Sequence, residues 1–168
     1  MKYICFAGEP ADANRFGNKG LRLARLARSG FNVPDFFVVT PEAFSTNNIQ
    51  CEIADAMQHI CPDGTLVAVR SSSLEEDGGQ SSFAGQLDSF LNVSGKDIAM
   101  RVADVWRSAF SERIRSYRQS QGLEGDISAP AVVVQRMVDA EVSGVAFAAD
   151  PVTGDRDVAV VAATSGTW

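Results

Sequence analysis

The chain has 168 residues, a formal net charge of -6, 45% hydrophobic residues and 21% charged residues. This balance is ordinary for a folded globular protein and excludes a disordered or fibrous chain. The excess of acidic residues argues against a general binder of nucleic acid or of anionic membranes. No apolar run approaches the ~18 residues that span a bilayer. We therefore expect one domain, or two small lobes, of a cytoplasmic protein without nucleic-acid or membrane partners.

The predicted elements combine hairpins and helices, which favours the α+β class over a strict succession of strand–helix–strand units. Residues 139–141 predict a hairpin turn between a strand at 131–138 and a strand at 142–149. The helix that begins near residue 98 is expected to be the longest of the chain. In chain order, the pattern predicts a strand at 3–7, a helix at 18–29, a strand at 36–40, a helix start at 40–42, a helix at 49–60, strands at 65–70 and 88–93, a helix over roughly twenty residues from 98 to 117, and strands at 131–138, 142–149 and 158–163.

The three cysteines form an odd set, Cys5, Cys51 and Cys61, without CxxC spacing. Such a set is typical of reduced, structural thiols rather than of a disulfide framework. His59 lies two residues before Cys61, but zinc needs about four ligands and no second pair lies nearby in the sequence. We expect no metal site among these residues and no relay that needs a second histidine.

A first candidate for phosphate binding is the segment FGNKG, Phe16 to Gly20. Asn18 is expected to cap the helix 18–29 and Gly30 to follow its end. Lys19 would then place an ammonium beside open backbone N–H groups at the positive end of a helix dipole. The alternative is a solvated lysine beside a flexible helix start, because the segment is not a full Walker pattern.

A second candidate is the loop sequence VAVRSSSLEEDGGQSSFAGQ, residues 67–86. Arg70 is expected to end a strand, where its two donors can grip phosphate oxygens. Ser81 and Ser82 offer hydroxyls, and glycines such as Gly85 permit close approach of the backbone to a ligand. The acids at 75–77 are expected to face solvent. The alternative is a mobile surface connection.

A third candidate is the segment VVVQRMVDAEVSGVAFAADPVTG, residues 132–154. Gln135 and Met137 alternate with valines along a strand, so both share one face. A polar group and a thioether can frame a flat aromatic ligand such as adenine, whose polar edge the last backbone groups of the strand could bind. The alternative is a methionine packed in the core with a glutamine at a strand end.

Together, in this order and spacing, the three segments resemble the N-terminal nucleotide-binding domain of the phosphoenolpyruvate synthase, pyruvate phosphate dikinase and rifamycin phosphotransferase family. The form SSFAGQ is more similar to the synthases and rifamycin enzymes. The resemblance implies an ATP-grasp architecture with a mixed sheet and flanking helices. Residues 1–130 would form the N-terminal lobe with the phosphate-binding segments, and residues 131–168 the hinge and the start of a second lobe.

The resemblance also implies roles for individual residues. Lys19 and Arg70 would be the catalytic phosphate contacts, and the loop with Ser81, Ser82, Gly85 and Gln86 would cover the phosphates. Gln135, Met137 and Val138 would form the adenine hinge. The cofactors would be ATP and Mg²⁺, with the magnesium ligands expected beyond residue 168.

In such enzymes a phosphoryl group passes from ATP to a histidine of a separate domain and then to pyruvate or a related acceptor. The phosphohistidine and acceptor-binding domains are expected in the full protein, and this chain alone is expected to be incomplete as an enzyme. Two alternatives stay open: a stand-alone nucleotide-binding or regulatory module, and a structural domain that has lost ATP.

Overall fold

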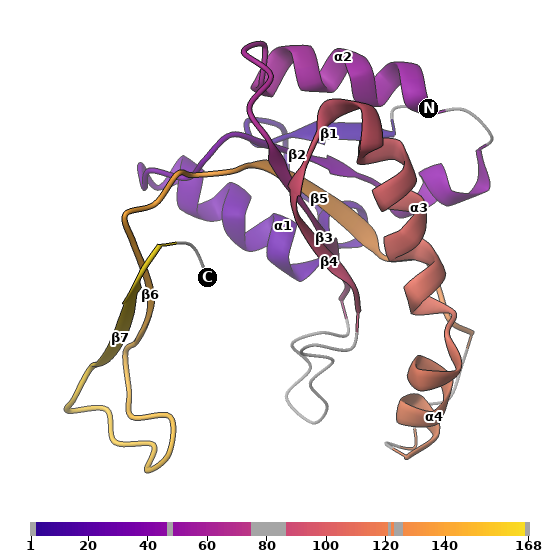
Figure 1. Ribbon diagram of the computed structural model, residues 1–168. Helices are drawn as coiled ribbons and strands as arrows, with labels where there is room; N and C mark the ends of the chain where they lie inside the picture. Colours follow the sequence, from indigo (N-terminus) through magenta and orange to yellow (C-terminus); the bar gives the residue numbers. More distant parts are fainter. Residues whose placement is uncertain (1–2, 47–48, 75–86, 121, 123–125, 167–168) are drawn as a thin grey trace. The chain divides into compact units, whose positions relative to one another are not determined.

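The computed structural model describes residues 3–46, 49–74, 87–120, 122 and 126–166 (Figure 1). The chain divides into two compact units, Met1–Met137 and Val138–Trp168. The first unit contains β1 (Ile4–Phe6), α1 (Ala13–Arg28), β2 (Phe36–Val39), the 3-10 turn η1 (Pro41–Ser45), α2 (Gln50–Ile60), β3 (Val67–Ser72), β4 (Ser89–Val93), the 3-10 turn η3 (Gly95–Asp97), α3 (Ile98–Ala109), α4 (Glu112–Ser120) and β5 (Ala131–Arg136). The second contains β6 (Val142–Phe147) and β7 (Val160–Ser165).

Within the described residues, the strands of the first unit form one five-stranded sheet in the order β1-β2-β5-β3-β4. All four neighbouring pairs are antiparallel. The α+β class is therefore confirmed, although the sheet is antiparallel throughout rather than mixed. The strand of this sheet that comes last in the sequence, β5, lies between β2 and β3, so that Val134 pairs with Phe37 on one side and with Val69 on the other.

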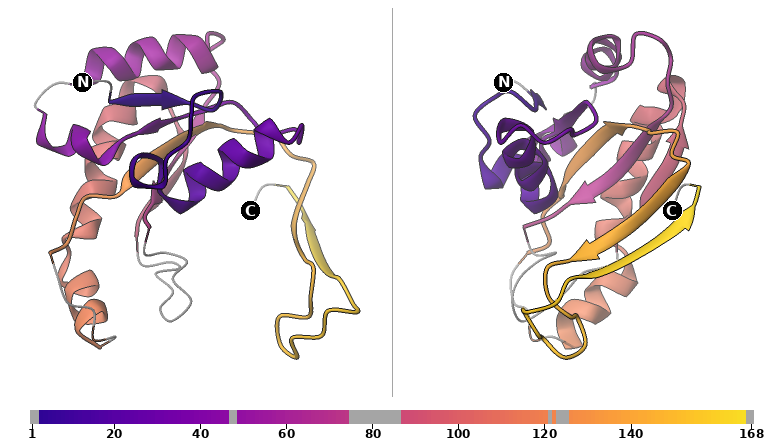
Figure 2. Two further views of the ribbon diagram at one scale, coloured as in Figure 1. Left: turned by 180° about the vertical axis from the view of Figure 1, so that it is seen from behind. Right: turned by 90° about the vertical axis from the view of Figure 1, so that its left-hand side faces the viewer.

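Helices cover both faces of this sheet, α1 on one face and α2 with α3 on the other (Figure 2). The alternation of side chains along each strand explains both contacts. On β5, Val133 packs with Phe16 of α1 in one cluster, whereas Val132 and Val134 pack into the larger cluster beneath α2 and α3. Because β5 is buried on both faces, its sequence is a continuous apolar run.

The helix predicted over 98–117 is wrong as a single element, because it divides into α3 and α4 around Phe110 and Ser111. At 16 residues, α1 is longer than either. The break has a local cause: the Ser111 hydroxyl oxygen accepts the N–H of Ile114 and the Ser111 carbonyl accepts that of Arg115. Ser111 thus begins a new helix in the manner of a capping residue.

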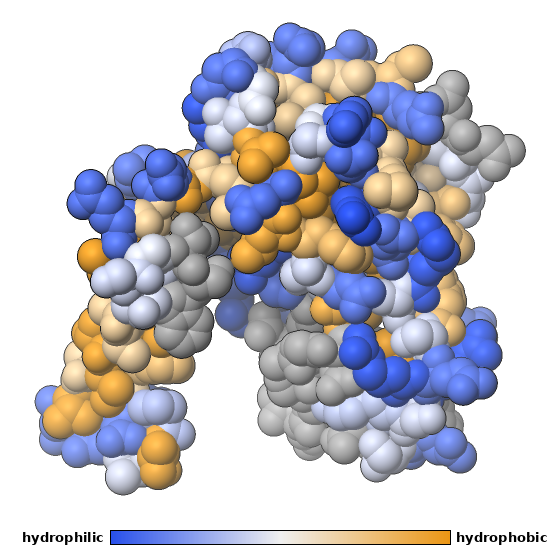
Figure 3. Space-filling model, viewed as in Figure 1, coloured by the Kyte–Doolittle hydropathy of each residue, from blue (hydrophilic) through white to orange (hydrophobic). Residues whose placement is uncertain are grey.

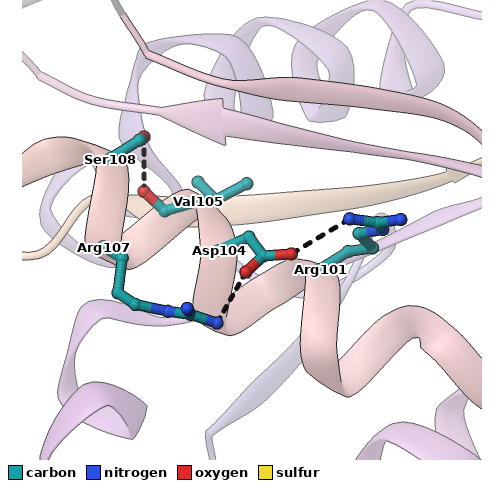
Figure 4. A network of polar contacts seen from close by, with 5 residues as sticks. All are labelled: Arg101, Asp104, Val105, Arg107 and Ser108. Atoms are coloured by element: carbon teal, nitrogen blue, oxygen red, sulfur yellow. Dashed lines mark hydrogen bonds and ion pairs between the residues drawn. The ribbon is translucent and has the colours of Figure 1, made fainter.

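The solvent face of α3 carries a small charge network (Figure 4). Asp104 accepts from Arg101 at 3.1 Å and from Arg107 at 2.6 Å, each three residues away. Near the end of the helix, the Ser108 hydroxyl donates to the Val105 carbonyl at 2.8 Å. Hydrophilic side chains gather over α3 on the face seen in Figure 3. These pairs lie at the surface and are partly exposed to solvent, so they contribute little to stability, and α3 is held mainly by its buried stripe.

The expected hairpin between the strands at 131–138 and 142–149 is also wrong. β5 already has β2 and β3 on its two edges, and β6 pairs instead with β7 in a separate antiparallel sheet. The connection between β6 and β7 turns at Asp150, whose carboxylate accepts the backbone N–H groups of Val152 and Thr153. These bonds, led by that of Thr153, lower the pKa of Asp150.

The end of β5 is held by an ion pair to the turn after α2. Arg136 donates to the Asp63 carboxylate at 2.5 Å and to the Ile60 carbonyl at 3.4 Å. The hydroxyl and backbone N–H of Thr65, together with Arg136, lower the pKa of Asp63 from 3.8 to about 2. The ionised carboxylate is therefore the form that the folded protein favours.

This lowered pKa gives a pH-dependent stability. The contribution of Asp63 is fully present above its ordinary pKa of 3.8 and is lost as the pH falls toward about 2. We expect the thermal midpoint of the wild type to exceed that of Asp63→Asn at about pH 5, and the difference to shrink by about pH 2. Thermal unfolding of both proteins across this range measures it. A difference that stays constant with pH would contradict the assignment.

No helix in the described part of the chain combines the length and the apolar character that a membrane span requires.

Candidate functional site

The helix that carries Lys19 is kinked at Gly17, whose φ of 62° and ψ of 177° are not helical. A Cβ at this position would lie 1.7 Å from the Ser72 carbonyl oxygen, so the backbone of the helix approaches the end of β3 more closely than any side chain would allow. The predicted cap is corrected: Asp12 is the N-cap of α1, accepting from the N–H of Asn14, and Asn18 lies just after the kink. Gly30 follows the helix end with a φ of 83°, as expected.

The N–H groups freed by the kink are taken up by β3 and the residues after it. The N–H of Asn18 donates to the Ser73 carbonyl at 3.3 Å, and that of Gly20 to the Ser72 hydroxyl at 3.0 Å. The Ser72 hydroxyl in turn donates to the Phe16 carbonyl at 2.7 Å. The expected cradle of open backbone N–H groups is therefore not present at Asn18 and Gly20.

Lys19 belongs to α1 and Arg70 belongs to β3. The Lys19 ammonium donates to the Ser71 carbonyl at 3.0 Å, which fixes it beside β3. Arg70 does not end its strand, since β3 continues to Ser72. It lies opposite Val133 of β5, on the face of the sheet that packs against α1, and its side chain is exposed.

One pocket of the first unit brings together three residues that the sequence singled out. It has a volume of about 200 Å³ and lies between α1 and the strands β3 and β5. Lys19, Arg70 and Gln135 line it, together with Arg22, Leu23, Leu26 and Val133. The pocket thus combines an apolar wall with cationic side chains, and no carboxylate belongs to its lining among the described residues.

Arg22, Leu23 and Leu26 are the site residues that sequence reasoning missed. Their periodicity puts the two leucines on one stripe of the helix and the arginine on another, with Arg25 and Arg28. The signal was nevertheless present, because positions 19, 22, 23 and 26 are three, four and seven residues apart and share one helix face. Leu26 is 42% exposed, which separates it from the core residue Ala24 at 0%.

Of the three residues expected to form the adenine hinge, Gln135 lines this pocket, whereas Met137 and Val138 do not. The Gln135 side chain lines the pocket and donates to the Pro34 carbonyl at 3.2 Å. The N–H of Met137 is bonded to the Leu66 carbonyl at 2.9 Å, so it is not an open donor for a base. Met137 ends the first unit and is not among the residues that line the pocket, and Val138 is the first residue of the second unit.

The loop residues Ser81, Ser82, Gly85 and Gln86 lie outside the described residues. Among the residues that are described, no group of three or more His, Cys, Asp or Glu side chains could hold a metal ion. Magnesium prefers carboxylate oxygens. The pocket offers it two arginines and a lysine, so these residues do not fit a magnesium ion.

Comparison with known proteins places these observations in a family. Residues 45–167 match the family model described as the pyruvate phosphate dikinase AMP/ATP-binding domain, a match that includes Arg70 and Gln135 but begins after Lys19. The chain is 50% identical to a rifampicin phosphotransferase of Streptomyces sp over 89% of its length, and 35% identical to the prodigiosin synthesizing transferase PigC of Serratia marcescens, also over 89%. It is 31% identical to a probable phosphoenolpyruvate synthase of Methanothermobacter thermautotrophicus over its full length.

The alignments cover only part of each relative, namely 22%, 20% and 31% of these three proteins. The chain therefore spans less than a third of the length of the relatives that it matches. The family match itself extends over more than half of the chain. The chain belongs to the family of pyruvate phosphate dikinase AMP/ATP-binding domains.

Proposed function

We propose that this chain is the ATP-binding part of a phosphotransferase with an ATP-grasp architecture. The observation that carries the proposal is the pocket that joins Lys19, Arg70 and Gln135 from three separate elements. Lysine and arginine are the side chains that bind phosphate oxygens, the first as a point charge and the second through paired donors. Family membership supports a nucleotide as the ligand.

In this proposal the cationic and the apolar residues of the pocket bind different parts of the nucleotide. Lys19 and Arg70 bind the phosphates and neutralise charge that develops there during transfer. Leu23, Leu26 and Val133 cover apolar surface of the nucleotide, and Gln135 offers an amide to its polar groups. Lys19 is pre-positioned by the Ser71 carbonyl, which reduces the entropy lost on binding.

The full protein would pass the phosphoryl group of ATP to a histidine of a separate domain and then to pyruvate or a related acceptor. The names of the relatives, phosphoenolpyruvate synthase and rifampicin phosphotransferase, support this class of reaction. We place it in the cytoplasm, where free thiols such as Cys5 and Cys51 stay reduced. Magnesium would serve the phosphates of the nucleotide, but we assign this pocket no metal ligand.

Calorimetric titration with ATP, in a buffer that contains magnesium, tests the site. We expect Lys19→Ala and Arg70→Ala each to weaken ATP binding by about tenfold or more, because each removes a charge-assisted hydrogen bond to phosphate. Lys96→Ala, which removes a lysine of the same charge in η3, is the control and should bind as the wild type does. Equal affinity in all four proteins would rule out the proposed contacts.

A further inference from the structure

Arg22 is a cation of the pocket that neither the family match nor the sequence motifs single out. It lies three residues after Lys19, one turn further along α1, and lines the same pocket. Residues at this spacing are neighbours on a helix surface, with Cβ atoms about 5–6 Å apart. Arg22 therefore widens the cationic region along the helix rather than adding a separate site.

Three cations now converge on one pocket from two elements, Lys19 and Arg22 from α1 and Arg70 from β3. This concentration stands out in a chain whose formal net charge is -6. A single phosphate group has three terminal oxygens and can be satisfied by two such side chains. A third, offset by one helical turn, is suited to an anion whose charge extends further, such as a chain of phosphates.

We propose that Arg22 binds the polyphosphate chain of the nucleotide and makes the pocket discriminate by the number of phosphates. The inference rests on the proposed function, since it concerns the same pocket. The attraction between a cation and a phosphate chain grows with the charge of the chain. Removal of Arg22 thus costs more affinity for a nucleoside triphosphate than for the monophosphate.

The geometry also provides a matched control on the same helix. Arg25 is exposed, as Arg22 is, and lies three residues further along the helix, but it is absent from the pocket lining. Arg22→Ala and Arg25→Ala remove the same charge from the same helix, so both lower the net positive charge of the helix equally, and a difference between them reports on the position of the charge relative to the pocket.

Titration with ATP and with AMP, on wild type, Arg22→Ala, Arg22→Lys and Arg25→Ala, tests the inference. We expect Arg22→Ala to weaken ATP binding by about tenfold and AMP binding by less than about threefold. Arg25→Ala should stay within about twofold of the wild type for both. Arg22→Lys keeps the charge and should retain most of the affinity for ATP, which also separates a lost contact from a misfolded variant.

Two results would overturn the inference while the proposed function stands. One is an Arg22→Ala protein that binds ATP as well as Arg25→Ala does, with Lys19→Ala still weakened. The other is an equal loss of ATP and AMP affinity in Arg22→Ala, which excludes discrimination by phosphate number. A wild type that binds neither nucleotide overturns the proposed function and this inference with it.

Discussion

Replacing Gly17 with alanine will lower the free energy of unfolding by about 3 kcal/mol or more. Two costs add at this position. A φ of 62° with a ψ of 177° is essentially confined to glycine and costs a residue with a Cβ about 1–3 kcal/mol. The new Cβ would also lie 1.7 Å from the Ser72 carbonyl oxygen, so α1 and β3 must separate, and overpacking of this kind typically costs about 1–3 kcal/mol.

Gly30→Ala is the matched control. Gly30 also has a positive φ, of 83°, but a Cβ there would meet nothing within 4 Å. Its replacement should cost only the conformational part, about 1 kcal/mol. Urea unfolding followed by tryptophan fluorescence measures the free energy of unfolding of both variants. The variants are made in a Trp168→Phe background, in which the buried Trp106 is the single tryptophan and reports on the first unit. If Gly17→Ala and Gly30→Ala lost the same free energy of unfolding, the close approach of Gly17 to Ser72 would add no cost of its own.

Replacing Phe16 with alanine will destabilise the first unit by about 3–5 kcal/mol, the usual cost of truncating a buried phenylalanine. Phe16 is fully buried and joins α1 to Phe36, Val38 and Val133 on its face of the sheet. This cluster is the smaller of the two, so few other side chains can close the cavity. The amides of α1 should exchange hydrogen faster in the variant, because the helix loses its main anchor.

Phe31→Ala provides the comparison for this prediction. Phe31 is 64% exposed and belongs to neither cluster. Its truncation should change the free energy of unfolding by no more than about 0.5 kcal/mol. If both variants unfolded at the same urea concentration, the small cluster could not be what holds α1 to the sheet.

The strands were the most predictable part of this fold. β1, β2 and β5 are short apolar runs bounded by breakers, and burial on the sheet rewards the residues that the pattern selects. What the pattern could not reveal is which strands pair. The hairpin expected after β5 failed because both edges of β5 are occupied by strands from distant parts of the chain.

The helices were less predictable at their ends than in their interiors. The apolar stripe of 98–117 continues across the break, because α3 and α4 both carry buried residues, such as Val105 and Ile114. The helix is interrupted at its C-cap Phe110, and the hydroxyl of Ser111 accepts from Ile114 at the start of the next helix. Likewise the open backbone N–H groups expected beside Lys19 are bonded at Asn18 and Gly20, and the missing side chain of Gly17 permits contact with Ser72.

The residues of the candidate site could be predicted where they belong to a polar or charged sequence motif, but not where they line the pocket only because of the orientation of a helix. Lys19, Arg70 and Gln135 were singled out by residue type and context, and all three line one pocket. Arg22 has the same chemistry as its neighbours Arg25 and Arg28. Only the position of the α1 axis over β3 and β5 separates it from them, and that position is a tertiary property.

The central place of β5 has a consequence for synthesis of the chain. While the ribosome has released only the first 130 residues, the inner edges of β2 and β3 have no partner, since β5 begins at Ala131. The two pairs β1–β2 and β3–β4 can form early, but they can join only after β5 has emerged. Contacts so distant in sequence are slow to form. Until then the half-built sheet exposes backbone groups that other nascent chains could capture, so a delay in translation just before Ala131 would favour aggregation over folding.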